Sequence, residues 1–407
     1  MTWILLCFER LAAFETRKEI HVMLHQNTVF HSLLKYVPWS RFEQLVEKYG
    51  ADRSCRTLTS KRHLVALLYG QFSGAVSLRE IVTGTMSHET RLYHVGAAPV
   101  KRSTVSDANQ QRPCQLFAEL FTVMLQQAHR GLRRAVGDAV RLIDSTSLHL
   151  SSLSAGWATF STEVYGAKAH IVYDPHADQP VYFAVTPANV NDITAAKAMP
   201  IEAGATYVFD LGYYDYGWWA AMDDAGCRFV TRLKKNTPFT VVHENRVGKN
   251  SKNIAGDHIG YLPDRLAASR KNPLQVPVRE IRVVIETGKM LRIVTNDLDA
   301  PAEEIAELYK QRWQIELFFR WVKQVLRIRN FIGISENAVR IQIAVALIAF
   351  LILRMAQAAQ KAVQSPLEFA RLVRANLMHR RILDRLLEPL QRLSVCPNQL
   401  TLELYSP

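Results

Sequence analysis

Apolar side chains in the first third of the chain recur at the spacing of an α-helix. Phe30, Leu33, Leu34 and Val37 fall on one helical face, and Pro38 ends that run. Similar runs follow, separated by short turns that contain glycine. The second helix is expected over residues 60–72, with Ser60 as its N-cap. A third begins at residues 77–82, and a fourth begins at 101–109 and continues through 116–120. The pattern predicts an all-helical region over residues 23–130.

The pattern changes to that of strands in residues 136–235. Residues 167–173 and 181–185 are rich in branched and aromatic side chains, and the segment between them is dense in Asp and Pro. These two runs predict a hairpin, and the apolar run 140–143 adds a third strand. The later elements are expected to be a helix over 192–199, a strand over 206–209, a helix over 216–225 and a strand over 229–233. This order predicts a mixed α/β sheet.

Residues 236–300 are more polar and lean toward strands. Their clearest element is a hairpin that pairs residues 278–286 with 290–295 across Thr287, Gly288 and Lys289. The segment therefore predicts a β-rich insertion.

The chain is helical in pattern from Pro301 to its end. An apolar helix is expected around residues 343–353 and a basic helix over 379–393. The most membrane-like stretch, 341–353, is shorter than the roughly 20 residues that cross a bilayer. We therefore expect a buried core helix and no membrane association.

Charge and cysteine content narrow the class of protein. The chain of 407 residues has 50 Lys and Arg against 37 Asp and Glu, a net charge of +13, which suits a polyanion such as nucleic acid. A basic enzyme without such a partner stays open, as does a plain helical bundle with solvated arginines. The five cysteines lie far apart without a C-x-x-C pair, which favours a reducing cytoplasm over a disulfide framework or a zinc site.

Residues 1–22 fit none of the later patterns. Their apolar run is too short for a signal peptide and has no basic start. Met23 opens a more ordinary beginning, so we expect residues 1–22 to be an extension, either not native or disordered.

Two aspartates each follow an apolar strand. Asp144 follows residues 140–143, and Asp210 follows 206–209. The end of a strand points into the crevice where ligands bind. One such aspartate is a weak signal, because aspartate also forms turns and caps, and Asp192 and Asp215 fit helix N-caps better. Two of them predict carboxylates that could hold divalent metal ions.

A third acid lies in a helix with one polar stripe. Tyr309, Arg312, Glu316 and Lys323 fall together on a helical wheel whose other positions are mostly apolar. A buried helix with a charged stripe must face a partner, a metal or an anion. Glu316 can supply a third carboxylate, Arg312 and Lys323 can hold phosphates, and the Tyr309 hydroxyl can donate to a phosphate oxygen. Alternatively, Glu316 only pairs with Arg312 and Arg320.

These residues resemble those of a known family. The spacing Tyr309-x2-Arg312-x3-Glu316-x6-Lys323 resembles the Y-R-E-K signature of bacterial insertion-sequence DDE transposases. Further similar segments are 208–213 around their second aspartate, 142–146 around their first, and 42–49 and 78–81 in their helical N-terminal domain. The likeness covers about residues 25–375.

The resemblance implies a ribonuclease H-like mixed α/β catalytic core with a β-rich insertion, an all-helical domain before it and a helical region after it. The expected parts are the extension 1–22, a DNA-binding domain 23–130, the core 131–235 and 301–335, the insertion 236–300, and a C-terminal region 336–407 that either forms an oligomer interface or packs into the core. It also implies that Asp144, Asp210 and Glu316 hold two Mg²⁺ ions, with Mn²⁺ as a substitute. The implied activity is cleavage of transposon ends and joining of their 3′-hydroxyls to target DNA, by a cytoplasmic homodimer on double-stranded DNA.

Some members of the family pass through a DNA hairpin, which needs a base moved out of the stack. Trp313 is a candidate wedge for that base, or else a packed core tryptophan. Arg232, Lys234 and Lys235, at or just past the end of strand 229–233, are candidate backbone contacts or solvated charges. Two other functions stay open: a non-catalytic DNA-binding regulator derived from a transposase, and another two-metal DNA nuclease.

Overall fold

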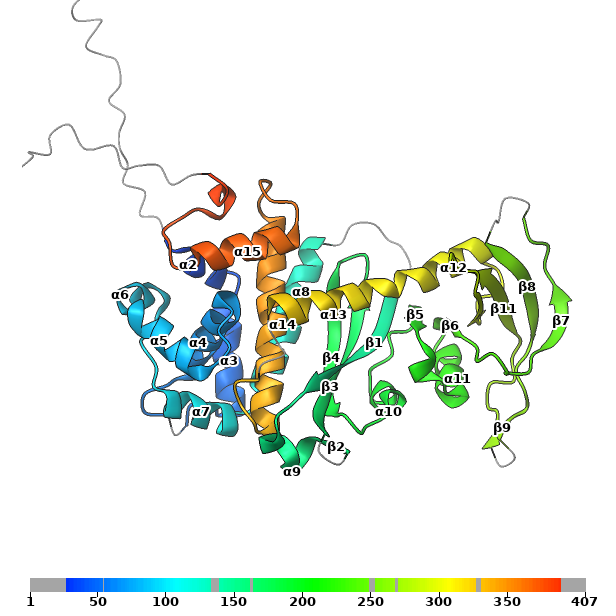
Figure 1. Cartoon of the computed structure of the whole chain (residues 1–407), viewed down its shortest axis with the longest axis horizontal. Coiled ribbons are helices and arrows are strands. Elements are labelled where there is room, and N and C mark those ends of the chain that lie inside the picture. The colour runs from blue at the N-terminus through cyan, green and yellow to red at the C-terminus, as the bar shows by residue number, and fades with distance from the viewer. Residues whose placement is uncertain are drawn as a thin grey trace, which may run out of the picture.

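The computed structural model describes residues 27–53, 55–132, 139–161, 164–248, 253–267, 270–326 and 331–388. The predicted extension 1–22 and the alternative start at Met23 lie outside these residues. The molecule is elongated, with a helical part at one end and a long sheet that runs toward the other (Figure 1).

The helical part begins as predicted. Its helices are α2 (Val29–Leu34), α3 (Trp39–Tyr49), α4 (Ser60–Ser73), α5 (Leu78–Ser87), α6 (Glu89–Leu92), the 3-10 turn η1 (Tyr93–Val95), α7 (Arg102–Gln111) and α8 (Cys114–Leu132). Two details differ from the prediction. Thr59, not Ser60, caps α4, because its hydroxyl accepts from the Arg62 N–H. The fourth helix is broken into α7 and α8, since the residue before Pro113 is driven into an extended conformation.

Two C-terminal helices complete this helical part. α14 (Glu336–Ala358) packs against α8 and α4, and α15 (Pro366–Asn376) packs against α14. α14 alone in the described residues is long and apolar enough to cross a membrane, and it is mostly buried inside the protein, as expected of a core helix. The predicted basic helix 379–393 is wrong for residues 379–388, which contain only the short turn η4 (Leu383–Arg385); the rest of it lies outside the described residues.

The mixed α/β sheet is confirmed. β1 (Val140–His149), β3 (Val164–Asp174) and β4 (Gln179–Pro187) are antiparallel neighbours, with β2 (Thr159–Ser161) paired to the start of β3. β5 (Thr206–Phe209) pairs parallel with β1, and β6 (Arg228–Arg232) pairs parallel with β5. The connecting elements are η2 (Ser152–Ser154), α9 (Ala155–Ala158), α10 (Asp192–Lys197), η3 (Leu211–Tyr213) and α11 (Tyr216–Asp224).

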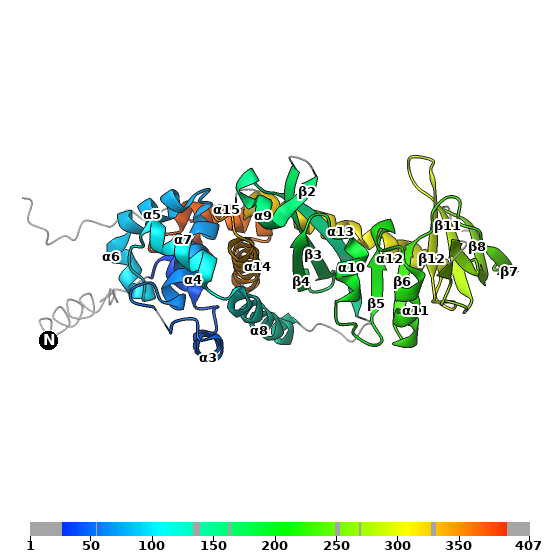
Figure 2. The ribbon, with the colours of Figure 1, turned by 90° about the horizontal axis from the view of Figure 1, so that it is seen from below.

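Residues 236–300 are β-rich as predicted, and their main strands extend the same sheet. β12 (Met290–Thr295) pairs antiparallel with β6, and β11 (Val278–Val284), β8 (Ile254–Tyr261) and β7 (Thr240–Glu244) follow in order. β9 (Arg265–Ala267) and β10 (Arg270–Lys271) form a small separate sheet. Figure 2 shows the resulting row of strands from β4 to β7. Ten strands therefore belong to one continuous sheet.

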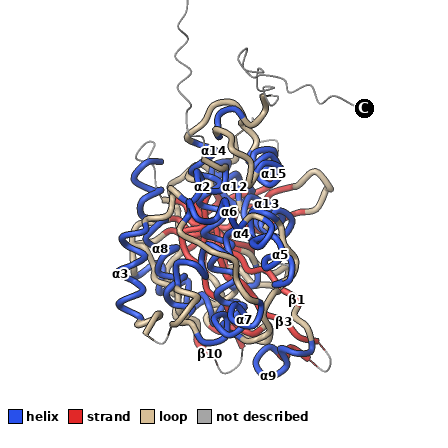
Figure 3. The backbone as a smooth tube through the Cα atoms, turned by 90° about the vertical axis from the view of Figure 1, so that its left-hand side faces the viewer, coloured by secondary structure: helices blue, strands red, loops and turns tan. Residues whose placement is uncertain are grey.

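The two faces of the sheet pack against different helices, as alternate strand residues point to opposite sides. Leu142 and Val208 lie in one core with residues of α12 (Ala302–Gln311) and α13 (Trp313–Val325). Ile143 and Phe209 lie in a second core with residues of α11. Seen from the helical end, the strands run behind and between the helices (Figure 3).

Candidate active site

Asp144 and Asp210 lie side by side at the point where β5 ends. β1 and β5 pair in parallel up to Ile143 and Phe209, so the next residue of each chain segment is an aspartate. Because Ile143 and Phe209 face the α11 side, both aspartates continue toward the α13 side; Asp210 keeps an extended backbone. The prediction that Asp144 ends its strand is wrong. β1 runs on to His149, since its polar residues still pair with β3.

The turn after Asp210 is tight. An Asp210 carboxylate oxygen accepts from the Gly212 N–H at 2.8 Å. A Cβ at Gly212 would lie 3.0 Å from that oxygen and 3.3 Å from an oxygen of Asp192, so only glycine leaves both carboxylates in place. Asp215 caps α11 as predicted, but the same expectation for Asp192 is wrong. Asn191 precedes α10, and Asp192 pairs instead with Lys168 at 3.1 Å.

Glu316 reaches this position from α13. The single predicted helix is two helices, α12 and α13, joined at Arg312, whose own backbone stays helical. One Arg312 nitrogen lies 2.8 Å from a Glu316 oxygen and 3.8 Å from an Asp144 oxygen. The two carboxylate oxygens are therefore no farther apart than the sum of these distances. The internal pair of Glu316 with Arg312 exists, but it belongs to a cluster that also includes Asp144.

The electrostatics of Asp144 reflect this crowding. The pKa of Asp144 is raised to about 7, chiefly by burial and also by the negative charges of Asp210 and Glu316. The Ser145 N–H, which donates to Asp144 at 2.7 Å, and the charge of Arg312 act in the opposite direction. Additional positive charge beside Asp144 would therefore favour its ionised form.

The donor set suits a hard divalent cation. Three carboxylates offer the oxygen ligands that Mg²⁺ prefers, and the excess negative charge around Asp144 is what such an ion would balance. Among the described residues, no three or more Asp, Glu, His or Cys side chains lie close enough together to bind one metal ion. The Arg312 guanidinium contacts two of the acids in this arrangement.

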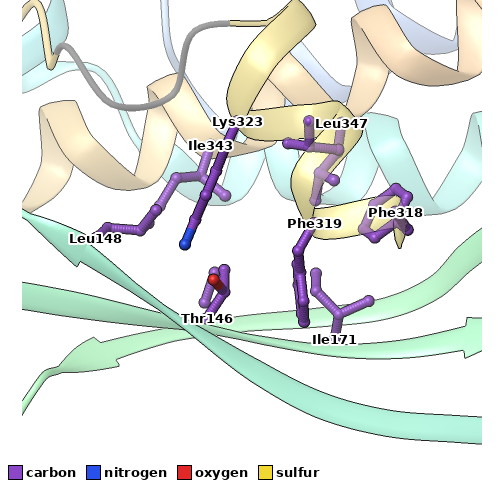
Figure 4. A pocket seen from close by; sticks show the side chains of 10 residues that line it. Thr146, Leu148, Ile171, Phe318, Phe319, Lys323, Ile343 and Leu347 are labelled. Atoms are coloured by element: carbon purple, nitrogen blue, oxygen red, sulfur yellow. The ribbon is translucent and has the colours of Figure 1, made fainter. Parts of the chain in front are cut away.

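Tyr309 and Lys323 are the other two residues of the polar stripe. Tyr309 is buried, which raises its pKa, while Arg232 and Arg312 each lie 5.9 Å from the centre of its ring and lower it. Lys323 lines a small cavity of about 20 Å³ beside Thr146 and Leu148. Figure 4 shows its amino group directed toward Thr146, which lies two residues beyond Asp144 on the same face of β1. Thr146 lies about 7 Å along the strand from Asp144.

One expectation for this helix is wrong. α13 is not apolar and buried all round, because Trp313 is 51% exposed and Leu317, one turn later, is 45% exposed. Trp313 is consequently not a packed core tryptophan. Its side chain lies on the surface, directly after Arg312 in the chain.

Lys234 and Lys235 lie in an exposed loop whose backbone is held by hydrogen bonds from Arg292. The Lys234 amino group lies 4.6 Å from the centre of the Tyr214 ring. An Arg292 nitrogen donates to the backbone oxygens of Lys234, Lys235 and Thr237 at 3.1, 3.0 and 2.8 Å. Arg292 also pairs with the fully buried Glu280. Sequence reasoning missed Arg292, whose role depends on the pairing of β12 with β6.

The chain is similar to known transposases. Residues 136–352 match the family described as Transposase DDE domain, and residues 25–98 match a domain of unknown function, DUF4372. A putative transposase, y4zB, of Sinorhizobium fredii is 43% identical over 280 residues, which are 68% of this chain and 77% of that protein. A probable transposase for insertion sequence element IS5377 of Geobacillus stearothermophilus is 29% identical over 338 residues, 81% of this chain and 85% of that protein.

A solved piggyBac transposase synaptic complex with hairpin DNA aligns with 91% of this chain and 84% of its own chain. The TM-score is 0.43 at 11% identity, which is too slight a likeness to indicate either fold or function.

Proposed function

The chain belongs to the DDE transposase family, enzymes that cleave and transfer DNA, and from this premise we propose that Asp144, Asp210 and Glu316 are its three catalytic acids. The proposed reaction is cleavage at the ends of an insertion sequence and joining of the 3′-hydroxyl ends to target DNA. One observation carries the proposal. Asp144 and Asp210 follow paired residues of two parallel strands, and Arg312 contacts both Asp144 and Glu316.

The sheet supports a ribonuclease H-like core for this chemistry. The five strands in the order β4-β3-β1-β5-β6 comprise an antiparallel trio followed by two strands parallel to β1. This topology puts Asp144 next to Asp210 without any contribution from residues 236–300. The two aspartates are therefore placed by the core itself.

Each residue of the stripe has a part in holding the substrate. Two Mg²⁺ ions, or Mn²⁺ in their place, bound by the three carboxylates would activate the attacking oxygen and stabilise the leaving one. The planar Arg312 guanidinium can hold two oxygens of a phosphate, and Lys323 and the Tyr309 hydroxyl can contact others. Lys234 and Lys235 bind the DNA backbone from a loop that Arg292 keeps fixed.

The partner is double-stranded DNA, at the transposon ends and at the target. A net charge of +13 favours this partner, and binding is expected to weaken as salt rises because phosphate contacts release counterions. Two ends must be brought together before joining, which favours a homodimer on DNA. We also propose a cytoplasmic location, because the widely spaced cysteines suit a reducing compartment.

Trp313→Ala is expected to lower the yield of a hairpin at the transposon end by about tenfold or more, while first-strand nicking changes little. An exposed indole can stack on a displaced base, and such stacking is worth roughly 1–3 kcal/mol. Gel analysis of end-labelled DNA separates nicked from hairpin products. Leu317→Ala is the matched control, since it removes an exposed apolar side chain one turn away; equal losses in both variants would exclude the wedge.

The proposed function is tested with the purified chain and a duplex that carries the terminal sequence bordering its gene. We expect nicks with free 3′-hydroxyls and joined target products in Mg²⁺, and neither after chelation. Binding without any cut product would identify a non-catalytic regulator. Hydrolysis without joining to target DNA would identify another two-metal nuclease.

A further inference from the structure

α7 presents an unusual set of side chains to solvent. Ser103, Ser106, Asp107 and Gln110 lie at helical spacing on its exposed side, and Arg102 begins the helix. In the part of the chain that the structure describes, none of these side chains makes a hydrogen bond or ion pair. Their donors and acceptors are therefore free to contact another molecule.

The opposite side of α7 is firmly anchored. Val105 and Asn109 are buried, and the Asn109 side-chain oxygen lies 2.8 Å from Nε2 of the buried His63 in α4. Asn337, at the start of α14, donates to the backbone oxygens of Asn109 and Arg112 at 2.9 and 2.7 Å. The exposed side chains thus stand on a helix that two other helices hold in position.

A basic hollow of about 390 Å³ lies beside α7, from Thr104 to the C-terminal end of the helix. Arg53 and Arg56 line it, both exposed and unpaired within the described residues, together with the buried Arg112. Arg112 donates to the Leu58 backbone oxygen at 2.7 Å, but its buried Nη1 has no acceptor among these residues. Arg112 also pairs with Asp52 at 3.3 Å, so the unbalanced positive charge of the hollow comes from Arg53 and Arg56. Asp107 is the one acid that lines it.

A second hollow, of about 420 Å³, lies at the N-terminal end of α7. Arg102 lines it from α7, and Arg79 lines it from α5. Both arginines are exposed, and neither has a partner in the described ranges. Positive charge is thus concentrated at each end of the same helix.

The dimensions of an α-helix match duplex DNA. A helix with its side chains is about 10–12 Å across, and the major groove of B-DNA is about 12 Å wide, with a phosphate backbone along each edge. We propose that α7 lies in the major groove and reads base edges, while Arg53 and Arg56 hold one backbone and Arg79 and Arg102 hold the other. Ser, Asp, Gln and Arg are all side chains that pair with base edges there.

The inference deepens the proposed function and rests on it. It gives a role to the domain of unknown function, which contributes Arg53, Arg56 and Arg79, and it identifies the element that would distinguish the transposon end from other DNA. Nothing in it depends on the catalytic acids, so binding can be measured without cleavage.

Binding of the full chain is measured over a range of salt, without Mg²⁺, to a duplex with the terminal sequence and to one of scrambled order. Arg53→Gln/Arg56→Gln is expected to weaken binding to both duplexes alike and to reduce the salt slope by about 2. Ser106→Ala/Gln110→Ala is expected to reduce the preference for the terminal duplex about tenfold and leave the slope unchanged.

Lys361→Gln/Arg371→Gln is the control, since it removes the same charge from exposed positions at and before α15. A change of slope as large in this control as in the Arg53 and Arg56 variant would overturn the inference. So would an unchanged preference in the Ser106 and Gln110 variant when the wild type prefers the terminal duplex. A wild-type chain that binds neither duplex would overturn the proposed function as well.

Discussion

Asp144→Asn is expected to lower Mg²⁺-dependent cleavage of the terminal duplex at least about a thousandfold, which corresponds to roughly 4 kcal/mol of transition-state stabilisation. Asparagine keeps the shape of the side chain but removes a charged metal ligand. The fold should tolerate it, because burial already raises the pKa of Asp144 to about 7, so a neutral group suits this position. Single-turnover cleavage and DNA affinity are measured together, and affinity is expected to stay within a few-fold.

Asp215→Asn is the matched control. Asp215 lies five residues after Asp210 but caps α11, where its carboxylate accepts from the Trp218 N–H at 2.8 Å. Asparagine keeps the cap and removes only the exposed ion pair with Lys197, so stability should fall by no more than about 1 kcal/mol and most cleavage should remain. Asp144→Cys and Asp210→Cys test whether these side chains bind the metal. Their cleavage is expected to recover in Mn²⁺ more than in Mg²⁺, since a thiolate suits Mn²⁺ better. Cleavage by Asp144→Asn at the wild-type rate would refute the role of this acid.

Arg279→Met is expected to lower the free energy of unfolding by about 3–5 kcal/mol, because it leaves Asp257 buried without its counter-charge. Both side chains are almost fully buried, and two Arg279 nitrogens each lie 2.7 Å from an Asp257 oxygen. Arg279 also donates to the backbone oxygens of Leu298 and Ala300, just before α12. Denaturant unfolding followed by fluorescence measures the loss.

Arg282→Met provides the comparison on the same strand. Arg282 is 39% exposed, and its partner Glu280 keeps a second ion pair with Arg292, so a loss of no more than about 1 kcal/mol is expected. Asp257→Asn combined with Arg279→Met should cost less than the two single changes added together, since the uncompensated charge is gone. Equal losses from Arg279→Met and Arg282→Met would show that the buried pair contributes no more than a surface one.

The sequence was most informative where one local pattern decides the structure. The run Thr206–Phe209 is a strand over the predicted residues, because a short apolar run between turn residues has few other conformations. The order of strands and helices along residues 140–233 followed from such runs. The spacing of Tyr309, Arg312 and Glu316 also indicated which side chains would share one face of a helix.

The prediction was weakest where partners are distant in the chain. β1 continues past Asp144 because Ser145, Thr146 and Ser147 pair with β3, and their polar side chains gave no sign of it. The exposure of Trp313 depends on which side of α13 the sheet covers, which periodicity alone cannot tell. Arg279 and Arg292 look like ordinary strand arginines until the register places Asp257 and Glu280 beside them.

The pairing of β12 with β6 limits how proteins of this architecture can be shortened or recombined. Excising residues 236–300 as a cassette would uncover the backbone groups of β6, whose middle residues Phe229, Val230 and Thr231 are buried. An open apolar strand of this kind recruits other chains and promotes aggregation. A minimal version would therefore have to retain β11 and β12 as a protective hairpin, or replace the lost neighbour with a charged strand.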